Sequence, residues 1–464
     1  MQLPFKNRIF DGLPHAYLVG GSVRDMVRKV QPLDLDVVVP RSPFRFARLL
    51  ATRLDGKVIT LGKDRFNVHR VVSEDLSIDV TAIKGDDIHS DLLARDFTIN
   101  AIAFDLTSGK IIDPLGGMAD LRKGRIKMVS PDAFSNDPAR LVRAFRMAAA
   151  MAFQIAPGTL RAIAGQADAI RMVAGERIWA ELELILVCPN SLPTIRLMAE
   201  SHLLLHLIPE LRPLMSCSQN RHHNTDVFTH TLQAYQALEE LLADPQCLVS
   251  PSAIEWATQL PSCDQVMIKT ALLFHDLGKP ASRGVRSNGT VHFFGHAEGG
   301  AVLARSIGQR LRIPNRHLNR IESIIRHHQR PLFLFLAQDR AGLHPKALGR
   351  FFRLCSAMTP YILIHAVADD AGKGAQGRGF HQDGIVFYLE LMEHYFESVL
   401  NEMSISLING HDLMKIFGIP PSPFLGKILK SIKELQVAGV LGNRDQAIKW
   451  VTKYLEDRCG MSDR

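Results

Sequence analysis

The segment Tyr17-Leu-Val-Gly-Gly-Ser-Val-Arg-Asp25, followed by Leu33-Asp-Leu-Asp-Val-Val-Val39, predicts the fold of the N-terminal part of this chain. Three apolar residues, two glycines and helical spacing over Val23–Val30 indicate a short buried strand, a tight turn and a helix. Glycines let backbone N–H groups approach an anion closely, and a helix start adds the positive end of its dipole. The unit is therefore typical of a phosphate-binding turn.

Two aspartates follow that turn in a second predicted strand. Asp34 and Asp36 lie two residues apart, so their side chains point to the same face. Carboxylates directed at one point repel each other unless a cation lies between them, and hard oxygen ligands suit Mg²⁺. Asp79, in a predicted strand over Ser77–Ala82, is either a solvent-facing residue or a third carboxylate of this site. A phosphate-binding turn beside paired metal-binding carboxylates suits phosphoryl or nucleotidyl transfer.

The composition is that of a soluble globular protein with two to four domains: 464 residues, 46% hydrophobic and 22% charged. A net charge of +8 favours a polyanionic partner. The six cysteines form no C-x-x-C pair, which argues against a zinc ribbon, and a disulfide framework is not expected in a chain of this size. The N-terminus lacks a signal-peptide core and the apolar runs are short, so we expect a cytoplasmic protein without a membrane partner.

Strand signals nearly vanish after Ser130, and a basic helix follows. The segment Asn136-Asp-Pro-Ala-Arg-Leu-Val-Arg-Ala-Phe-Arg146 opens with capping residues and a proline that suits a first helical turn. Arg140, Arg143 and Arg146 recur every third residue and share one side of the helix. They form either a solvated stripe or the edge of a groove that holds a polyanion, and the apolar residues between them favour the groove.

Histidines and aspartates gather in the second half of the chain. Imidazole and carboxylate suit Mn, Fe, Ni or Zn, and one adjacent His-Asp pair with distant partners can close a metal site. A single histidine on an apolar helix is usually a core residue, but a series of five with an adjacent His-Asp favours a metal site. The residues are His230, His275, Asp276, His296, His327, His328 and Asp369.

The N-terminal motifs, in their order, resemble those of the class II tRNA nucleotidyltransferases, which include CCA-adding enzymes and bacterial poly(A) polymerases. The motifs are Leu18-Val-Gly-Gly-Ser-Val-Arg-Asp25, Asp34-Leu-Asp36, Arg95-Asp-Phe-Thr-Ile-Asn-Ala101, Asp113-Pro-Leu-Gly-Gly117 and the arginine helix above. The resemblance is strong over residues 15–210, and Glu176-Arg-Ile-Trp-Ala-Glu181 adds a weaker match. It implies extension of an RNA 3′ end from nucleoside triphosphates without a nucleic-acid template.

The resemblance also implies roles for individual residues. Asp34 and Asp36 would hold Mg²⁺, and Asp79 would complete the catalytic site. The triphosphate would be held by Gly20, Gly21, Ser22 and Arg24. The residues that would contact the sugar or shape the site are Arg95, Asp96 and Asn100. The arginine helix, with Asp137, Arg140, Arg143 and Arg146, would bind the nucleotide.

Asp137 and Arg140 would act as an amino-acid template for the incoming base. Cytosine and adenine both present an amine beside a ring-nitrogen acceptor, so a carboxylate can accept from the amine while a guanidinium donates to the ring. Guanine and uracil present a carbonyl instead, and unpaired buried polar groups can give discrimination of about 10⁴. The pair would therefore select C and A.

Two departures from the family pattern bear on specificity. Asn136 stands where the family usually has glutamate, which removes a charge but keeps a capping oxygen. The segment between Asp79 and Arg95 lacks the longer flexible loop that helps complete CCA-adding relatives change from CTP to ATP. The short segment resembles the CC-adding subclass, whose partner is a separate A-adding enzyme. Complete CCA addition and poly(A) synthesis are the alternatives.

The histidine set resembles the HD superfamily of metal-dependent phosphohydrolases. Matching residue by residue gives His230, His275, Asp276 and Asp369 as primary ligands. His296 and either His327 or His328 would hold a second metal ion or contact a phosphate. In a rival hypothesis this hydrolase is the main activity and the N-terminal part binds RNA; an RNA-binding scaffold without catalysis is disfavoured, because both sets of residues are intact.

The expected fold is an α+β head, a mixed sheet with helices, followed by a mostly helical body. We expect a catalytic head over residues 1–130, a helical neck over 131–210, an HD domain over 211–385 and a small helical domain over 386–464. A lysine-rich amphipathic helix near Gly426–Lys433 either contacts tRNA phosphates or is a solvated face. The partners would be the tRNA acceptor arm, CTP and, in complete CCA addition, ATP.

Overall fold

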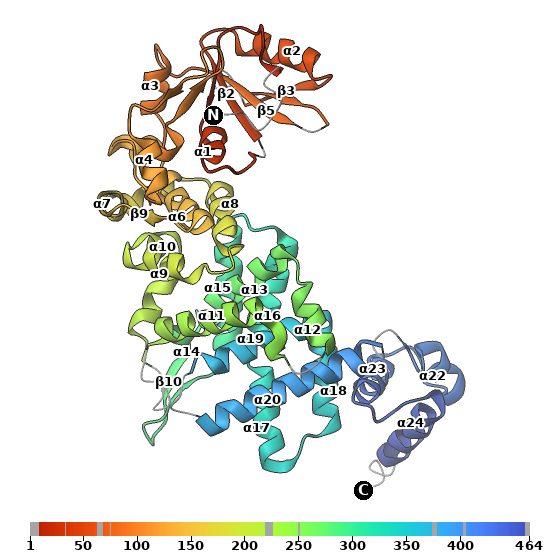
Figure 1. Ribbon diagram of the computed structural model, residues 1–464. Helices are drawn as coiled ribbons and strands as arrows, with labels where there is room; N and C mark the ends of the chain where they lie inside the picture. The colour runs from red at the N-terminus through yellow and green to blue at the C-terminus, as the bar shows by residue number, and fades with distance from the viewer. Residues whose placement is uncertain are drawn as a thin grey trace. The chain divides into compact units, whose positions relative to one another are not determined.

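The computed structural model describes residues 9–32, 34–62, 68–74, 76–218, 226–248, 251–373, 378–401 and 405–459 (Figure 1). The chain forms two compact units. The first comprises Met1–Cys188 and Thr194–Leu207, and the second Pro189–Pro193 and Ile208–Arg464. The expected fold class, an α+β head followed by a helical body, is confirmed.

The first unit is built on a seven-stranded sheet (Figure 1). Its strand order is β3-β4-β5-β2-β1-β6-β7, in which β2 and β5 run parallel and every other neighbouring pair is antiparallel. The strands are β1 Tyr17–Val19, β2 Asp34–Val39, β3 Lys57–Leu61, β4 Val68–Val72, β5 Ser77–Ala82, β6 Ala103–Asp105 and β7 Ile111–Ile112. The sequence also predicts a strand over Asn67–Val72; β4 begins at Val68, and Asn67 lies outside the described residues.

The two faces of this sheet differ in chemistry because side chains alternate along each strand. Leu35 and Val37 of β2 and Ile78 and Val80 of β5 are buried on one face. Helix α2, Pro43–Arg53, packs against β2, β3, β4 and β5. The polar residues of β2 and β5, at the positions between, lie on the opposite face.

Helix α1, Gly21–Val27, begins directly after the glycine turn and is displaced from the expected Val23–Val30. Gly20 has φ +67, a conformation that suits glycine, and this allows the helix to start at the next residue. The helix ends early because Lys29 is left-handed, with φ +60. The early start brings the N–H groups of the first helical turn closer to β2.

The rest of the first unit is mostly helical. Its core includes α6, whose Leu141, Val142 and Phe145 are fully buried, packed on α8. The elements are α3 Ile88–Leu93, η3 Thr98–Asn100, α4 Gly117–Arg122, β8 Arg125–Ile126, α5 Asp132–Asn136, α6 Arg140–Met151, β9 Gln154–Ile155, α7 Pro157–Gln166, η4 Ala167–Met172, α8 Gly175–Leu186, α9 Leu192–Glu200 and α10 Leu203–Leu207.

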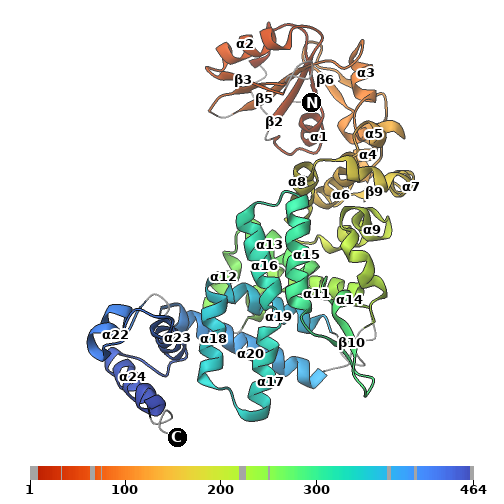
Figure 2. The same ribbon diagram turned by 180° about the vertical axis from the view of Figure 1, so that it is seen from behind.

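The second unit is a helical body in which α19 packs against α11, α13, α16 and α20 (Figure 2). Its elements are η5 Pro209–Ser216, α11 Val227–Ala243, η6 Pro245–Cys247, α12 Pro251–Thr258, α13 Ser262–Phe274, α14 Lys279–Ser282, β10 Arg283–Val285, β11 Val291–Phe293, α15 His296–Arg310, α16 Asn315–His327, α17 Arg330–Ala341, α18 Pro345–Cys355, η7 Ser356–Met358, α19 Thr359–Ala371, α20 Arg378–His394, η9 Tyr395–Val399, α22 Gly410–Phe417, α23 Pro423–Val437 and α24 Arg444–Cys459.

One stretch of the described residues, Pro345–Ala371, is long and apolar enough to cross a membrane by length and composition. It comprises α18, η7 and α19, and 72% of its most apolar window is buried inside the protein. Such burial is the pattern of a core helix.

The C-terminal helices α22, α23 and α24 have a core of their own, which includes Ile428, Ile432 and Leu435. Helix α23 packs against α18 of the helical body, where Gly349 lies against the backbone of Glu434. A Cβ built at Gly349 would lie 1.7 Å from the Glu434 carbonyl oxygen, so only glycine permits this approach.

Candidate functional site

The three head carboxylates come from neighbouring strands. Asp36 and Asp79 are register partners on parallel β2 and β5, so their side chains leave the sheet on one face, with Asp34 two residues before Asp36. Burial raises the pKa of Asp36; Arg95 opposes this, and the charges of Asp79 and Asp34 add to it. A bound cation would relieve the repulsion between this half-buried carboxylate and the like charges around it.

Arg70 of β4 is a partner of this set that the sequence analysis missed. Its guanidinium donates to both oxygens of Asp79 at 2.7 and 2.8 Å. Among the described residues, the head forms no group of three ligand atoms within 4.8 Å of one another. Asp34 and Asp36 thus remain the candidate Mg²⁺ ligands, and Arg70 holds the carboxylate of Asp79. The alternation of β4 could have revealed it, because Arg70 interrupts Val68, Val71 and Val72.

The glycine turn lies directly against the aspartate strand. A Cβ added to Gly20 would lie 2.9 Å from Nη1 of Arg95 and 3.1 Å from Oδ2 of Asp36, so the turn requires glycine. The buried Ser22 hydroxyl accepts from the Asp36 N–H at 2.7 Å and donates to the Asp34 carbonyl at 3.3 Å. Ser22 therefore fixes the spacing of the carboxylates, and its hydroxyl is already engaged by the backbone of β2.

A polar chain links Arg24 to the residues after α3. Arg24 donates to Oδ1 of Asn100 at 3.0 Å, and Asn100 donates to Oδ1 of Asp96 at 2.9 Å. Arg24 also forms a bidentate pair with its neighbour Asp25, with both contacts at 2.8 Å. The predicted residues Arg24, Asp96 and Asn100 are therefore brought together.

A cleft of about 850 Å³ lies beside these groups. Arg95 on its wall is held by two donations to Asp91 at 3.0 and 2.9 Å. Arginines and short polar residues make the wall suitable for an anionic ligand. The residues that line it include Thr81, Lys84, Arg95, Asp96, Arg140 and Arg143.

Asp137 and Arg140, expected to read the base together, have separate partners in this structure. Asp137 accepts two hydrogen bonds from Nη2 of Arg177 at 3.0 and 2.9 Å. Burial opposes ionisation of Asp137, but Arg177 outweighs it and lowers its pKa. Arg140 donates to the carbonyls of Ala94 and Arg95 at 3.0 and 3.2 Å, and its buried Nε has no hydrogen-bond partner.

Glu181 of α8 joins the other two arginines of the helix. It accepts from Nε of Arg143 at 2.9 Å and from Nε of Arg146 at 2.5 Å. The expected groove edge is therefore divided: Arg140 and Arg143 line the cleft, whereas Arg146 pairs with Glu181. The sequence signal for this partner was the Glu176–Glu181 motif.

We expect Glu181→Ala to lower the free energy of unfolding by about 2–3 kcal/mol, because it leaves two partly buried arginines without their carboxylate. Arg177→Ala should cost only about 0.5 kcal/mol, since the Arg177 side chain is 52% exposed. Chemical denaturation followed by circular dichroism measures both. Equal losses would contradict the distinction between a buried hub and a surface pair.

The second unit brings the predicted histidines and aspartates into two groups. In the first, Nε2 of His230 lies 2.8 Å and Nε2 of His275 lies 3.3 Å from Oδ1 of Asp369. The second group is Asp276, His296 and His328. Within each group the candidate ligand atoms lie within 4.8 Å of one another.

Asp276 connects the two groups. Its Oδ2 lies 3.2 Å from Nε2 of His275, and its Oδ1 lies 3.5 Å from Nε2 of His296. Burial opposes its ionisation, but His275 and Lys279 outweigh this and hold the pKa of Asp276 well below its usual value. Burial lowers the pKa of His275, but Asp276 and Asp369 outweigh it and raise this pKa to about 10. One carboxylate between two sets of ligands suits a pair of cations.

Backbone contacts set the orientation of three of the histidines. Nδ1 of His275, His296 and His328 contacts the carbonyl three residues earlier, at 2.7, 2.8 and 2.6 Å. A proton on Nδ1 leaves Nε2 as a lone pair for a metal ion. Nε2 of His296 and of His328 lie 3.2 Å apart. Two nitrogens about 2.1 Å from one ion, at an angle of about 100°, have about that separation, so the donor set fits a divalent cation.

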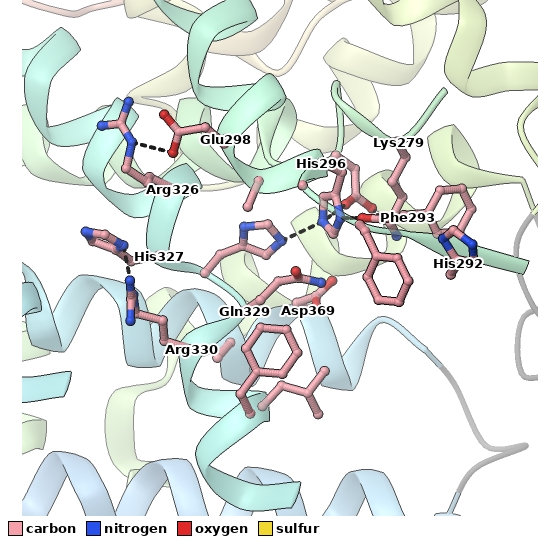
Figure 3. A pocket seen from close by; sticks show the side chains of 18 of the residues that line it. Lys279, His292, Phe293, His296, Glu298, Arg326, His327, Gln329, Arg330 and Asp369 are labelled. Atoms are coloured by element: carbon pink, nitrogen blue, oxygen red, sulfur yellow. Dashed lines mark hydrogen bonds and ion pairs between the residues drawn. The ribbon is translucent and has the colours of Figure 1, made fainter. Parts of the chain in front are cut away.

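The structure distinguishes between His327 and His328, which the sequence left open. His328 is buried in the second group, whereas Nδ1 of His327 accepts from Nε of Arg330 at 3.0 Å (Figure 3). His327 lies with Lys279, Arg326 and Arg330 on the wall of a cavity of about 710 Å³ that reaches the metal groups (Figure 3). A cavity with cations on its wall and candidate metal ligands at its base suits a phosphoester.

His365 of α19 is a further histidine of this cluster that the sequence analysis missed. It is fully buried, and its ring centroid lies 5.0 Å from that of His275 and 5.6 Å from that of His328. Neither ring nitrogen has a hydrogen-bond partner. Burial and the nearby His275 lower its pKa to about 3. The available signal was its spacing, four residues before Asp369 on one helix.

Four family models match the chain. They describe the poly A polymerase head domain at residues 16–127, the RNA and SrmB-binding site of polymerase A at 152–215, the HD domain at 227–396 and the tRNA nucleotidyltransferase domain 2 at 400–451.

Three relatives match over 79% to 96% of this chain. An A-adding tRNA nucleotidyltransferase of Deinococcus radiodurans is 30% identical over 96% of this chain and 97% of its own length. A CC-adding tRNA nucleotidyltransferase of Thermus thermophilus is 28% identical over 93% and 92%. A multifunctional CCA protein of Nitrosococcus oceani is 32% identical over 79% and 87%.

Solved structures share the fold. A Thermotoga maritima CCA-adding enzyme complexed with tRNA is 21% identical, with a TM-score of 0.65 over 95% of this chain and 91% of that one. A CCA-adding enzyme with CTP is 22% identical, with a TM-score of 0.68 over 97% and 93%. The family models and the relatives define a nucleotidyltransferase. The chain belongs to the tRNA nucleotidyltransferase family of CCA-adding enzymes and poly(A) polymerases, and it carries a fused HD domain.

Proposed function

We propose that this enzyme adds two cytidines to the 3′ end of tRNA from CTP and stops before the terminal adenosine. The observation that carries the proposal is the short segment between Asp79 and Arg95. It contains the end of β5, a bend and helix α3, and Ile88 and Leu92 of α3 are buried in the core. The longer loop that helps related enzymes change from CTP to ATP has no counterpart there.

Asp91 fixes this segment against the cleft. Its carboxylate accepts from the Lys84 N–H at 2.9 Å and from Arg95, and its side chain is 3% exposed. A wall tied down in this way favours one pyrimidine-sized pocket over a pocket that changes shape. The names of the relatives include A-adding, CC-adding and multifunctional CCA enzymes, so A addition, complete CCA addition and poly(A) synthesis are the alternatives.

The candidate site residues of the head have separate roles in this reaction. Asp34 and Asp36 would hold Mg²⁺, which when bound would activate the 3′-hydroxyl and neutralise charge on the pyrophosphate. The N–H groups at Gly20 and Gly21 and the guanidinium of Arg24 bind the triphosphate. Asp79, held by Arg70, keeps negative charge beside Asp36.

The base is read by Asp137 and Arg140, and two observations support this assignment. Burial opposes ionisation of Asp137, but Arg177 lowers its pKa and so favours the carboxylate, which an acceptor of the cytosine amine requires. Arg140 has one buried donor, Nε, without a partner. The helical neck and the lysines of α23 bind the tRNA acceptor arm through its phosphates and shape. Because the substrate is tRNA, we expect the protein to act in the cytoplasm beside a separate A-adding enzyme.

We expect tRNA transcripts that end before CCA to gain two residues from CTP and none thereafter, even when ATP is present. The test supplies each nucleotide singly and then CTP with ATP to purified protein with Mg²⁺, and separates the products at single-nucleotide length. A third residue that requires ATP would make this a complete CCA-adding enzyme. Addition only to transcripts that end in CC would establish A addition, and long A tails would establish poly(A) synthesis.

We propose a second activity, metal-dependent hydrolysis of phosphoesters, at the HD centre. The specific observation is the pair of ligand groups joined by Asp276 at the base of a cavity walled by Lys279, Arg326 and Arg330. The donor sets suit Mn, Fe, Ni or Zn, which activate water for attack on phosphorus. The protein residues bind and orient the anionic ester.

A further inference from the structure

We propose that His365 is a positioning residue of the HD centre: its ring holds an ordered water between the two ligand groups and so supports cation binding. The inference rests on the HD activity proposed above and adds a residue that none of the metal-ligand motifs contains. His365 touches neither ester nor cation in this assignment, and it acts through the water it holds.

The first step concerns the free energy needed to bury the two ring nitrogens of His365 if no water contacts them. Buried polar atoms in folded proteins are almost always hydrogen-bonded, and an orphaned one points to a bound water, an ion or a functional role. His365 is 0% exposed, and neither Nδ1 nor Nε2 has a partner. Leucine would fill a similar volume without this cost. Retaining an imidazole there is therefore informative.

The second step is where the ring lies. His365 is edge-on to His275, with an interplanar angle of 75°, and tilted by 57° to His328. His275 belongs to the first ligand group and His328 to the second. The charges that act on His365 come from His275, Asp369, Asp276 and His230. The His365 ring thus lies beside one residue of each ligand group, His275 and His328.

The third step excludes direct coordination. Ligands of one octahedral ion lie at most about 4.2 Å apart when each bond is about 2.1 Å. His365 is a member of neither group whose atoms lie within 4.8 Å of one another. A water molecule bridges the remaining distance, since it both donates and accepts and needs a site with two or more polar partners.

The helix supplies the register. His365 and Asp369 are four residues apart on α19, so both side chains leave the same face of that helix. One face of one helix therefore carries a ligand of the first group and the residue that orders the water. This explains why a histidine is kept in an otherwise apolar turn of Ile362, Leu363 and Ile364.

The test compares His365→Leu with the parent protein by Mn²⁺ titration in calorimetry and by the melting temperature of the metal-free protein. We expect Mn²⁺ affinity to fall about 10–100-fold, the usual effect of losing an outer-shell partner. The metal-free melting temperature should be equal to or higher than that of the parent, because leucine fills a similar volume without the cost of burying two polar ring nitrogens. His365→Gln, which can still hold water, should recover part of the affinity.

His317→Leu is the matched control, because His317 lies on α16 outside both ligand groups and does not line the cavity; it should leave Mn²⁺ affinity unchanged. Parent-like affinity in His365→Leu would overturn the inference and make His365 a core residue. A metal-free His365→Leu that melts well below the parent would overturn it too, since it would show that the ring stabilises the fold. A parent protein that binds no Mn²⁺ would instead overturn the HD activity, and the inference with it.

Discussion

Asp36→Asn is expected to lower the rate of CTP incorporation into tRNA by about 10³-fold, because it removes a metal-binding carboxylate worth several kcal/mol in the transition state. The exchange keeps the shape of the side chain, and the Asp36 N–H still donates to Ser22. The fold should therefore survive. The measurement is single-turnover extension of a tRNA transcript with Mg²⁺ and CTP.

The control for this variant is Glu74→Gln, which neutralises an exposed carboxylate in the turn between β4 and β5. It should extend tRNA at the parental rate. If Asp36→Asn retained a tenth or more of that rate, the paired aspartates would not be the metal ligands of the reaction. Circular dichroism of both proteins separates loss of chemistry from loss of fold.

Asp276→Asn is expected to abolish phosphoester hydrolysis and to leave CTP incorporation unchanged. Asp276 lies between both ligand groups, so its loss disturbs two cations at once. We expect at least about a 10³-fold loss of activity on nucleoside phosphoesters. Metal content measured on the same sample should fall as well.

Glu255→Gln is the matched control for that experiment. Glu255 of α12 is exposed, accepts a hydrogen bond from Nε2 of Gln259 at 3.1 Å and is not among the residues that line the cavity. Its replacement should preserve both metal content and hydrolysis. If Asp276→Asn impaired CTP incorporation as strongly as hydrolysis, the two activities could not belong to separate sites.

Much of the head could be predicted from the sequence because its signals are local. The strand Ser77–Ala82 occurs with the predicted bounds. Alternation along a strand also placed Asp34 and Asp36 on one face. The relation of Asp79 to them could not be predicted, because it depends on the parallel pairing of β2 with β5 across many residues.

The missed residues share a physical cause. Arg70 and Arg177 act through Asp79 and Asp137, which lie outside their own strand and helix; the alternation of β4 indicates which face Arg70 lies on, but neither arginine gives a local sign of its partner. His365 sits among apolar residues and resembles an ordinary core histidine. The family resemblance implies that Asp137 and Arg140 act as a pair, but in the structure Arg140 donates to three backbone carbonyls and Asp137 accepts from Arg177.

The carbonyl contacts at Nδ1 of His275, His296 and His328 have a consequence for how the HD centre tolerates mutation. In many metal sites a neighbouring carboxylate selects the tautomer of each histidine, so one substitution nearby can disable a ligand. Here the main chain makes that selection, and no codon change removes a backbone oxygen. The local backbone fixes the proton on Nδ1 of each histidine. The surrounding side chains can therefore change while Nε2 stays available to a metal ion.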